Sequence, residues 1–201
     1  MSVFSDYICP FCYIGFARLE QLRDEFDLKV DWIALEIHPD NPPEGRPVAE
    51  LGYPPERWQQ MMAALYRMAE EEGLPIAQRS FTTNSHKALL LSEAAKEDGE
   101  TAFYRLHRRL FEAYLGEAQN IGDVDVLRRL ADEVGIHEQT MDRAWRAPRY
   151  EERLQANRVM AGRYGATGTP TFVFGKRLLV GAVPTLALRE AALHESAAAT
   201  G

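Results

Sequence analysis

The segment Ser5-Asp6-Tyr7-Ile8-Cys9-Pro10-Phe11-Cys12-Tyr13-Ile14-Gly15 joins a short extended stretch, Ser2 to Tyr7, to an amphipathic helix that we expect to reach about Phe26. Pro10 fits the first helical position, because its missing N–H would have no partner there. This places Cys9 at the N-cap, where it should face outward. Apolar side chains recur at helical spacing after it and put the second cysteine on the buried face: Cys12, Phe16, Leu19, Leu22 and Phe26.

The two cysteines are the only ones in the chain, and they stand three residues apart. A thiolate at a helix N-terminus accepts otherwise unpaired backbone N–H groups, which lowers its pKa and makes Cys9 a candidate nucleophile. Cys12, about one helical turn away, can then attack a mixed disulfide formed at Cys9. Two other interpretations stay open: a zinc half-site completed by two scattered histidines, and a pair of inert, packed cysteines.

Beyond this segment the sequence predicts a strand, a connection and a long helical stretch. The strand runs from Leu28 to Ile37, and its apolar phase changes at Trp32 and Ile33, which indicates a bulge or burial on both faces. The proline-rich stretch Pro39 to Pro55 predicts a loop without regular structure. The expected helices are Glu56–Glu72, Ser85–Asp98 with Asn84 as its N-cap, Thr101–Gly116, Val124–Val134, Glu138–Trp145 and Arg149–Tyr164.

The end of the chain returns to strand. Gly175-Lys176 is a two-residue turn signal, so the segments on either side of it, Thr171–Phe174 and Arg177–Val180, should form a hairpin. Pro184–His194 is expected as the last helix. Two separated α/β pieces are more economically joined in one sheet than left as exposed edges. We therefore predict a discontinuous α/β domain, residues 1–40 and 165–195, with a linker and helical insertion at 41–164 and a flexible tail at 196–201.

These residues resemble a known family. The segment from Phe4 to Gly15 is similar to the opening of DsbA-family thioredoxin-fold proteins, in particular the FrnE-like branch, and Gly168-Thr169-Pro170-Thr171-Phe172-Val173 is similar to that family's cis-proline segment. The Gly181-Ala182 pair before the last helix agrees as well. The resemblance implies a thioredoxin-like fold with a helical insertion, a dithiol/disulfide active site, and a cis bond between Thr169 and Pro170 beside the cysteines.

Several ionisable residues are candidates for a place near the cysteine pair. Thioredoxin-like proteins often carry a buried carboxylate six residues before the first cysteine, but Val3 stands there, so the proton acceptor for Cys12 is unassigned. Glu36 is a candidate, although a solvated Glu at a strand end is the simpler interpretation. Asp6 would oppose a Cys9 thiolate if its charge points at the sulfur, and His38 would help one if it is charged nearby.

Apolar residues near the pair have their own expected places. Phe11 and Tyr13 should form a rim around Cys9. Aromatic and methionine side chains in the helical stretch are expected in a helical core rather than in a binding groove: Trp58, Trp145, Met61, Met62 and Met68.

Composition limits the partners. The chain of 201 residues has a net charge of −7, which argues against nucleic acid, because binding to phosphates uses clustered cations. No apolar run is long enough to span a bilayer, and the residues from Met1 to Tyr7 lack the features of a secretory signal. We expect a cytoplasmic protein with no membrane partner. The first strand is short for its role, which is compatible with a natural start upstream of Met1.

The sequence therefore predicts a thiol-disulfide oxidoreductase without cofactor or metal. A disulfide reductase or isomerase is one form of this activity, and the sequence leaves the direction of the redox reaction open. Cys9 and Cys12 are the expected catalytic residues, and Pro10, Phe11, Thr169 and Pro170 the substrate-binding ones. The partners are protein or small-molecule thiols and disulfides, including glutathione. One alternative is a glutathione-dependent isomerase or kappa-class glutathione transferase-like enzyme, whose members typically have serine where Cys9 stands. The other is a non-catalytic interaction or zinc-binding protein.

Overall fold

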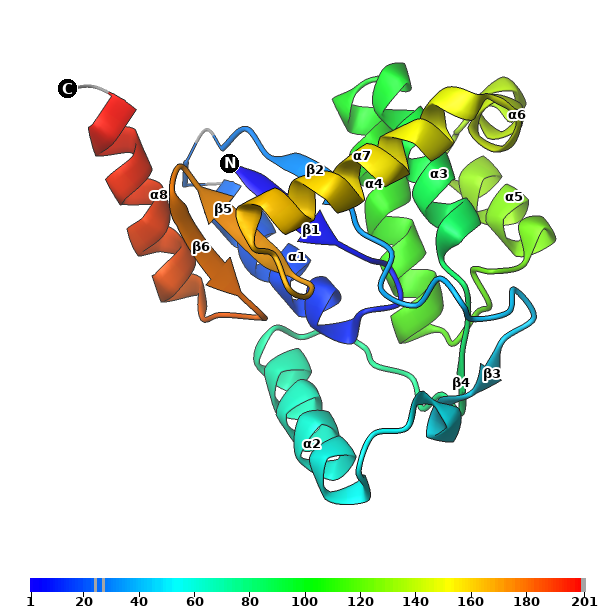
Figure 1. Ribbon diagram of the computed structural model, residues 1–201, viewed down its shortest axis with the longest axis horizontal. Coiled ribbons are helices and arrows are strands. Elements are labelled where there is room, and N and C mark those ends of the chain that lie inside the picture. The colour runs from blue at the N-terminus through cyan, green and yellow to red at the C-terminus, as the bar shows by residue number, and fades with distance from the viewer. Residues whose placement is uncertain (24, 27, 200–201) are drawn as a thin grey trace.

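A four-stranded mixed sheet forms the centre of the protein (Figure 1). The structure is a computed structural model and describes residues 1–23, 25–26 and 28–199. The strands are β1 (Ser2–Ser5), β2 (Asp31–Ala34), β5 (Thr171–Phe174) and β6 (Arg177–Val180), in the order β2-β1-β5-β6. β1 runs parallel to β2 and antiparallel to β5. The two ends of the chain therefore share one sheet, as the sequence predicted, and the hairpin has the predicted bounds.

Both faces of this sheet are buried. Val3, Trp32 and Phe172 face one cluster of apolar side chains, whereas their neighbours Phe4, Ile33 and Val173 face another. Helices α1 (Pro10–Arg23) and α8 (Thr185–Ala199) cover the first face, and α7 (Pro148–Tyr164) covers the second (Figure 1). The change of apolar phase at Trp32 and Ile33 thus reflects burial on both faces. The strand there is shorter than the predicted Leu28–Ile37.

The helical stretch begins with α2, which lies apart below the sheet, and its helices from α3 to α6 form a layer beside the sheet (Figure 1). It contains α2 (Pro55–Glu71), α3 (His86–Ala95), η2 (Lys96–Asp98), α4 (Glu100–Phe111), η3 (Glu112–Gly116), α5 (Val124–Glu133) and α6 (Glu138–Arg146). Every helix predicted between Glu56 and Tyr164 is present, with bounds shifted by a few residues, and η3 is a π-helical turn at the end of α4. The fold is a thioredoxin-like α/β fold with a large helical insertion, which confirms the predicted fold class.

The prediction of a loop without regular structure from Pro39 to Pro55 was wrong. This stretch contains the short strand β3 (Arg46–Pro47) and the 3-10 turn η1 (Val48–Leu51). β3 pairs antiparallel with β4 (Phe81–Thr82), which lies more than thirty residues further along the chain. A two-residue strand gives no periodic signal of its own, because its partner comes from the tertiary fold.

A buried polar group joins the helical layer to the sheet. The Tyr7 hydroxyl donates to Ser92 Oγ at 2.7 Å and lies 2.7 Å from His107 Nδ1. Burial lowers the pKa of His107 well below its usual value, so this ring is neutral. Aromatic rings surround it, the nearest being Trp32 with centroids 4.4 Å apart.

The buried guanidinium of Arg18 links α1 to the end of α2 and to the segment before α8. Arg18 donates from Nε to Glu72 at 2.6 Å, at the end of α2, and from Nη1 to the carbonyls of Ala182 and Val183 just before α8. The Gly181-Ala182 turn is thereby held against α1.

The C-terminal helix extends beyond the predicted end at His194, since α8 continues to Ala199. Of the predicted tail, residues 200 and 201 lie outside the described residues. The division into a discontinuous α/β domain, an insertion and a tail stays a prediction. In the described part of the chain, no helix combines the length and apolar character needed to cross a bilayer.

Candidate active site

The two cysteines lie at the start of α1, and both are free thiols. The helix begins at Pro10, so Cys9 directly precedes it, and the Cys12 N–H donates to the Cys9 carbonyl at 3.0 Å. Cys12 is 1 % exposed on the apolar stripe, as predicted. The prediction that Cys9 faces outward was wrong: it is 6 % exposed, because α2 and the segment before β5 enclose a cavity over the first turn of α1.

The segment before β5 packs directly on α1. The Thr169–Pro170 bond is cis, as the family resemblance implied. Gly15 allows the approach, because a Cβ at this position would lie 2.9 Å from Phe172 Cζ and 3.2 Å from Pro170 Cγ. The Cys9 thiol donates to the Thr169 carbonyl oxygen at 3.3 Å. Thr169 and Pro170 are therefore brought to Cys9 from the far end of the chain.

The two thiols have opposite electrostatic environments. A hydrogen bond from the Cys12 thiol lowers the pKa of Cys9, and the Thr169 hydroxyl and the Cys12 backbone N–H lower it further, against the effect of burial. Burial raises the pKa of Cys12 well above its usual value, and the neighbouring Cys9 adds to this rise. The Ser5 hydroxyl and the Asp6 backbone N–H act on Cys12 in the opposite direction. Of the two thiols, Cys9 is therefore the one that loses its proton first.

Asp6 is a buried carboxylate beside the pair. It accepts from the Ile8 N–H at 3.2 Å and the Ile37 N–H at 2.8 Å, and the Ser85 side chain also contacts it. Burial raises its pKa to about 6, in spite of these hydrogen bonds. Its charge raises the pKa of Cys9, which is the opposing effect that the sequence suggested. Nothing in the sequence pattern indicates that a carboxylate three residues before Cys9 is buried.

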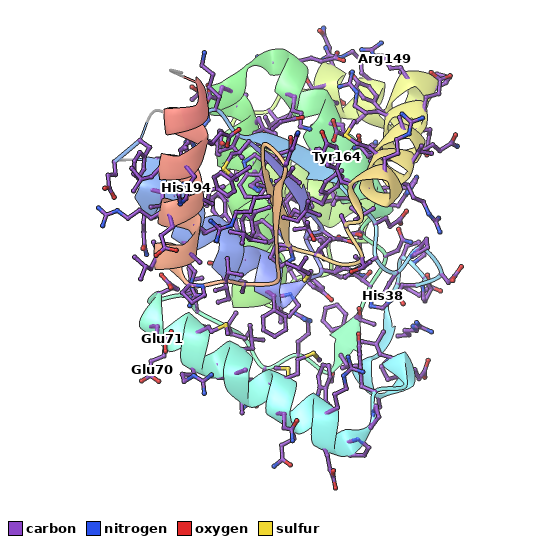
Figure 2. The ribbon with its side chains drawn as sticks, turned by 60° about the vertical axis from the view of Figure 1, so that its left-hand side comes forward. His38, Glu70, Glu71, Arg149, Tyr164 and His194 are labelled. Carbon is purple, nitrogen blue, oxygen red and sulfur yellow. The ribbon has the colours of Figure 1, made fainter. Side chains whose placement is uncertain are left out.

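The cavity beside Cys9 has a volume of about 520 Å³. Figure 2 shows side chains of α2 that point upward toward the rest of the protein, with His38 above this helix. Pro10, Phe11 and Thr169 line the cavity, whereas Pro170 is buried behind it. The predicted substrate-binding residues thus lie together at the start of α1. Their role stays a prediction.

Two groups of apolar residues differ from expectation. Trp58, Met61 and Met62 line the cavity and are not confined to a helical core, since α2 turns this face toward Cys9. Tyr13 is not part of a rim, because it is 3 % exposed and stacks on Phe111 with centroids 5.7 Å apart. Trp145 and Met68 pack against the core as expected.

Glu36 and His38 also line the cavity. The Glu36 carboxylate binds His86 Nδ1 at 3.2 Å and Asn84 Nδ2 at 3.4 Å, and the hydrogen bond to Glu36 raises the pKa of His86 to about 9. Glu36 is therefore already paired, and the groups that contact Cys12 are Ser5 and Asp6. Burial lowers the pKa of His38, so this ring is neutral and does not stabilise a thiolate at pH 7. Sequence reasoning missed His86.

The match of a family model decides the family. The model of the DSBA-like thioredoxin domain matches residues 1–192. The chain belongs to this family of DsbA-like thiol-disulfide oxidoreductases. A curated relative, the uncharacterized protein YwbO of Bacillus subtilis strain 168, is 31% identical over 185 residues, which cover 90% of each chain.

Solved structures with the same fold include several DsbA-like proteins. The probable DsbA oxidoreductase SCO1869 from Streptomyces coelicolor is 25% identical with a TM-score of 0.83, over 98% of this chain and 89% of its own. A 2-hydroxychromene-2-carboxylate isomerase is 17% identical with a TM-score of 0.75, over 100% and 98%. The cytosolic disulfide reductase DsbM from Pseudomonas aeruginosa, solved with GSH, is 21% identical with a TM-score of 0.70, over 96% and 98%.

Metal ligands do not gather at this DSBA-like site. Within residues 1–23, 25–26 and 28–199, no group of three or more His, Cys, Asp and Glu side chains is arranged to hold a metal ion.

Proposed function

We propose that this DSBA-like protein exchanges thiols and disulfides through Cys9 and Cys12, with Pro10, Phe11, Thr169 and Pro170 positioning the substrate. The observation that carries the proposal is the opposite shift of the two thiols: the Cys12 hydrogen bond lowers the pKa of Cys9, while burial raises that of Cys12. In such a pair Cys9 is the sulfur that reacts first with the substrate, and Cys12 reacts only afterwards.

In the reducing direction, the Cys9 thiolate attacks one sulfur of a substrate disulfide. A mixed disulfide forms at Cys9, and the other half of the substrate leaves as a thiolate. Cys12 then loses its proton and attacks the Cys9 sulfur. The Cys9–Cys12 disulfide forms, the second half of the substrate leaves, and two electrons have passed from the protein to the substrate. The oxidising direction is the reverse of these steps.

The environment of Cys12 fits its place in this order. Besides burial, the Cys9 thiolate raises the pKa of Cys12 by accepting a hydrogen bond from its thiol and by its charge. Once Cys9 is held in a mixed disulfide, that charge is gone, while the Ser5 hydroxyl and the Asp6 N–H still favour a Cys12 thiolate. Cys12 therefore becomes easier to ionise when the second attack requires it.

The substrates are thiols and disulfides, either small molecules or proteins, with glutathione as a partner. The fold likeness to DsbM, solved with GSH, supports glutathione. In the cytoplasm that we propose as its location, the pair would cycle with glutathione or a reductase. The FrnE-like branch remains the subtype that the sequence favours.

A glutathione-dependent isomerase is the second candidate. The likeness to an isomerase fold and the mainly apolar cavity beside Cys9 favour it. This reaction would leave both cysteines dispensable, so glutathione-dependent isomerisation of an aromatic substrate by a Cys9→Ser, Cys12→Ser double variant would support it over the first proposal.

Disulfide turnover by single cysteine variants tests the first proposal. Cys9→Ser should abolish insulin reduction, because no other thiol is placed to attack. Cys12→Ser should accumulate mixed disulfides with the substrate, visible by mass spectrometry, because nothing resolves them. Full dithiol-disulfide turnover by the Cys9→Ser variant would overturn the mechanism.

A further inference from the structure

Arg79 is a fixed cation without an acidic partner. Its Nε donates to the Phe81 carbonyl at 3.0 Å, its Nη1 to the Tyr114 carbonyl at 3.1 Å, and its guanidinium lies 3.9 Å from the centre of the Tyr114 ring. Among the described residues, no carboxylate forms an ion pair with it. Arg18, the other arginine held by backbone carbonyls, pairs with both Glu71 and Glu72.

The lack of an acidic partner stands out in this chain. Acidic side chains outnumber basic ones by 30 to 23, so a buried arginine would ordinarily be paired. Burial lowers the pKa of Arg79, which agrees with a cation whose charge is not fully compensated. Two bonds to carbonyls and the Tyr114 side chain fix the direction of the guanidinium.

Arg79 lines the same cavity as Cys9. The walls between them are mainly apolar and aromatic, with Tyr53 and Trp58 stacked at 5.9 Å and Met61, Met62 and Leu65 contributed by α2. Glu36 and His38, the carboxylate and the imidazole of this wall, do not offset the charge of Arg79. Glu36 is paired with His86, and burial keeps His38 neutral.

We propose that the cavity binds small disulfides or thiols that combine an aromatic or other apolar body with a carboxylate, which Arg79 pairs with while the sulfur lies at Cys9. A guanidinium that lines a cavity and has no acidic partner suits a carboxylate. A volume of about 520 Å³ is within the range that holds a small organic ligand. This inference rests on the proposed function for the chemistry at Cys9, but the binding of the carboxylate does not depend on it.

The reaction of such a substrate needs no other component. The reduced protein carries two thiols, Cys9 attacks the aromatic disulfide and expels one aromatic thiolate, and Cys12 attacks Cys9 and expels the second. One protein disulfide and two aromatic thiols result, and the two protons of the protein thiols pass to solvent or to the released thiolates.

Single-turnover kinetics with two aromatic disulfides test the proposal. Pre-reduced protein is mixed with 5,5′-dithiobis(2-nitrobenzoate), whose rings each carry a carboxylate, or with neutral 2,2′-dithiodipyridine, and thiol release is followed by absorbance. Arg79→Met should lower the rate of thiol release from the anionic disulfide at least about tenfold. The rate with the neutral disulfide should stay within about twofold of the wild type, because only a charge-assisted contact is lost. Arg79→Lys should lie between Arg79→Met and the wild type.

Arg67→Met is the matched control, since Arg67 is an exposed α2 residue that does not line the cavity and its loss changes the net charge equally. It should leave both rates unchanged. An equal fall of both rates in Arg79→Met, or no fall of either, would overturn the proposal, the first because Arg79 would then act only on the structure.

Equilibrium binding separates this inference from the proposed function. In a Cys9→Ser, Cys12→Ser variant, 4-phenylbenzoate should bind at least about tenfold more tightly than 4-phenylbenzamide by calorimetry, and Arg79→Met should remove the difference. If the acid binds more tightly through Arg79 but neither disulfide reacts with the wild type, the carboxylate site is supported and the proposed function is wrong. If both disulfides react but the acid binds no more tightly than the amide, the carboxylate site is wrong and the proposed function is unaffected.

Discussion

The Cys9 thiol donates a hydrogen bond to the Thr169 carbonyl oxygen at 3.3 Å, across 160 residues of sequence. This contact closes the site, because the first turn of α1 and the segment before β5 meet there. It depends on the pairing of β1 with β5, which sets Phe4 opposite Thr171. The reactive sulfur is thus held by both ends of the chain, while the insertion supplies the cavity that it faces.

The Thr169 hydroxyl should tune this sulfur. It lowers the pKa of Cys9, so Thr169→Val should raise that pKa while the carbonyl contact is kept. The Thr169 Oγ1 is buried beside the protonated thiol without a hydrogen-bond partner among the residues that the structure describes, so it can turn and donate to the thiolate. A hydrogen bond to a charged group contributes about 1.5–3 kcal/mol, so the pH profile of iodoacetamide alkylation should move to higher pH by about 1–2 units. Thr167→Val, at a neighbouring cavity residue, should change little. Equal titration curves for the two variants would contradict this role.

Asp6 should make the stability of the protein depend on pH. Because burial raises its pKa from 3.8 to about 6, the stability that it contributes is fully present below pH 3.8 and is lost as pH rises through 6. A shift of this size corresponds to about 3 kcal/mol. Between pH 4 and 7, the free energy of unfolding of the wild type should therefore fall relative to Asp6→Asn, measured by urea denaturation. Asp40→Asn, at an exposed position, serves as the control, and parallel profiles of wild type and Asp6→Asn would refute the expectation.

The same substitution should change the reactivity of Cys9. The Asp6 carboxylate raises the pKa of Cys9, so Asp6→Asn should move the pH profile of iodoacetamide alkylation to lower pH. A better stabilised thiolate also favours the reduced form, so the variant should be the stronger oxidant in equilibrium with glutathione. If Asp6→Asn and the wild type have the same pH profile of alkylation, the Asp6 charge does not affect the pKa of Cys9.

Tyr7 should hold the helical layer to the sheet. Its hydroxyl bonds both Ser92 and His107 in a buried site, so Tyr7→Phe leaves two polar groups without this partner. We expect a loss of about 1–3 kcal/mol in the free energy of unfolding, read from urea denaturation. Tyr104→Phe removes a hydroxyl that accepts one bond, from Trp32, and should cost less. A larger effect at Tyr104 than at Tyr7 would count against this account.

Local patterns predicted the elements that depend on local chemistry. The apolar stripe of α1 placed Cys12 in the core, and the Gly175-Lys176 turn with its flanking strands fixed the hairpin bounds. The joining of both ends in one sheet followed from the need to pair strand edges. These predictions succeeded because spacing alone determines which face of an element is buried.

The features that sequence reasoning missed come from tertiary contacts. Cys9 is buried because α2 packs on α1 through Leu65 and Ile14, far apart in the chain. Asp6 is a buried carboxylate because the Ile37 N–H and Ser85 meet it from other segments. No spacing rule links such residues. The roles assigned to the site residues and the domain boundaries therefore stay predictions.

Gly15 should be required for the contact between α1 and the segment before β5. A Cβ there would lie 2.9 Å from Phe172 Cζ and 3.2 Å from Pro170 Cγ, so Gly15→Ala forces one of these buried rings to shift and should destabilise the protein by about 1–3 kcal/mol. Gly162→Ala is the matched helical control in α7, where a Cβ meets nothing within 4 Å and should stabilise by about 0.5–1 kcal/mol. Because the shift would also displace Pro170 beside Cys9, Gly15→Ala should slow alkylation of Cys9, whereas Gly162→Ala should not. Two variants with equal stability and equal Cys9 reactivity would show that the close approach at Gly15 does not constrain the site.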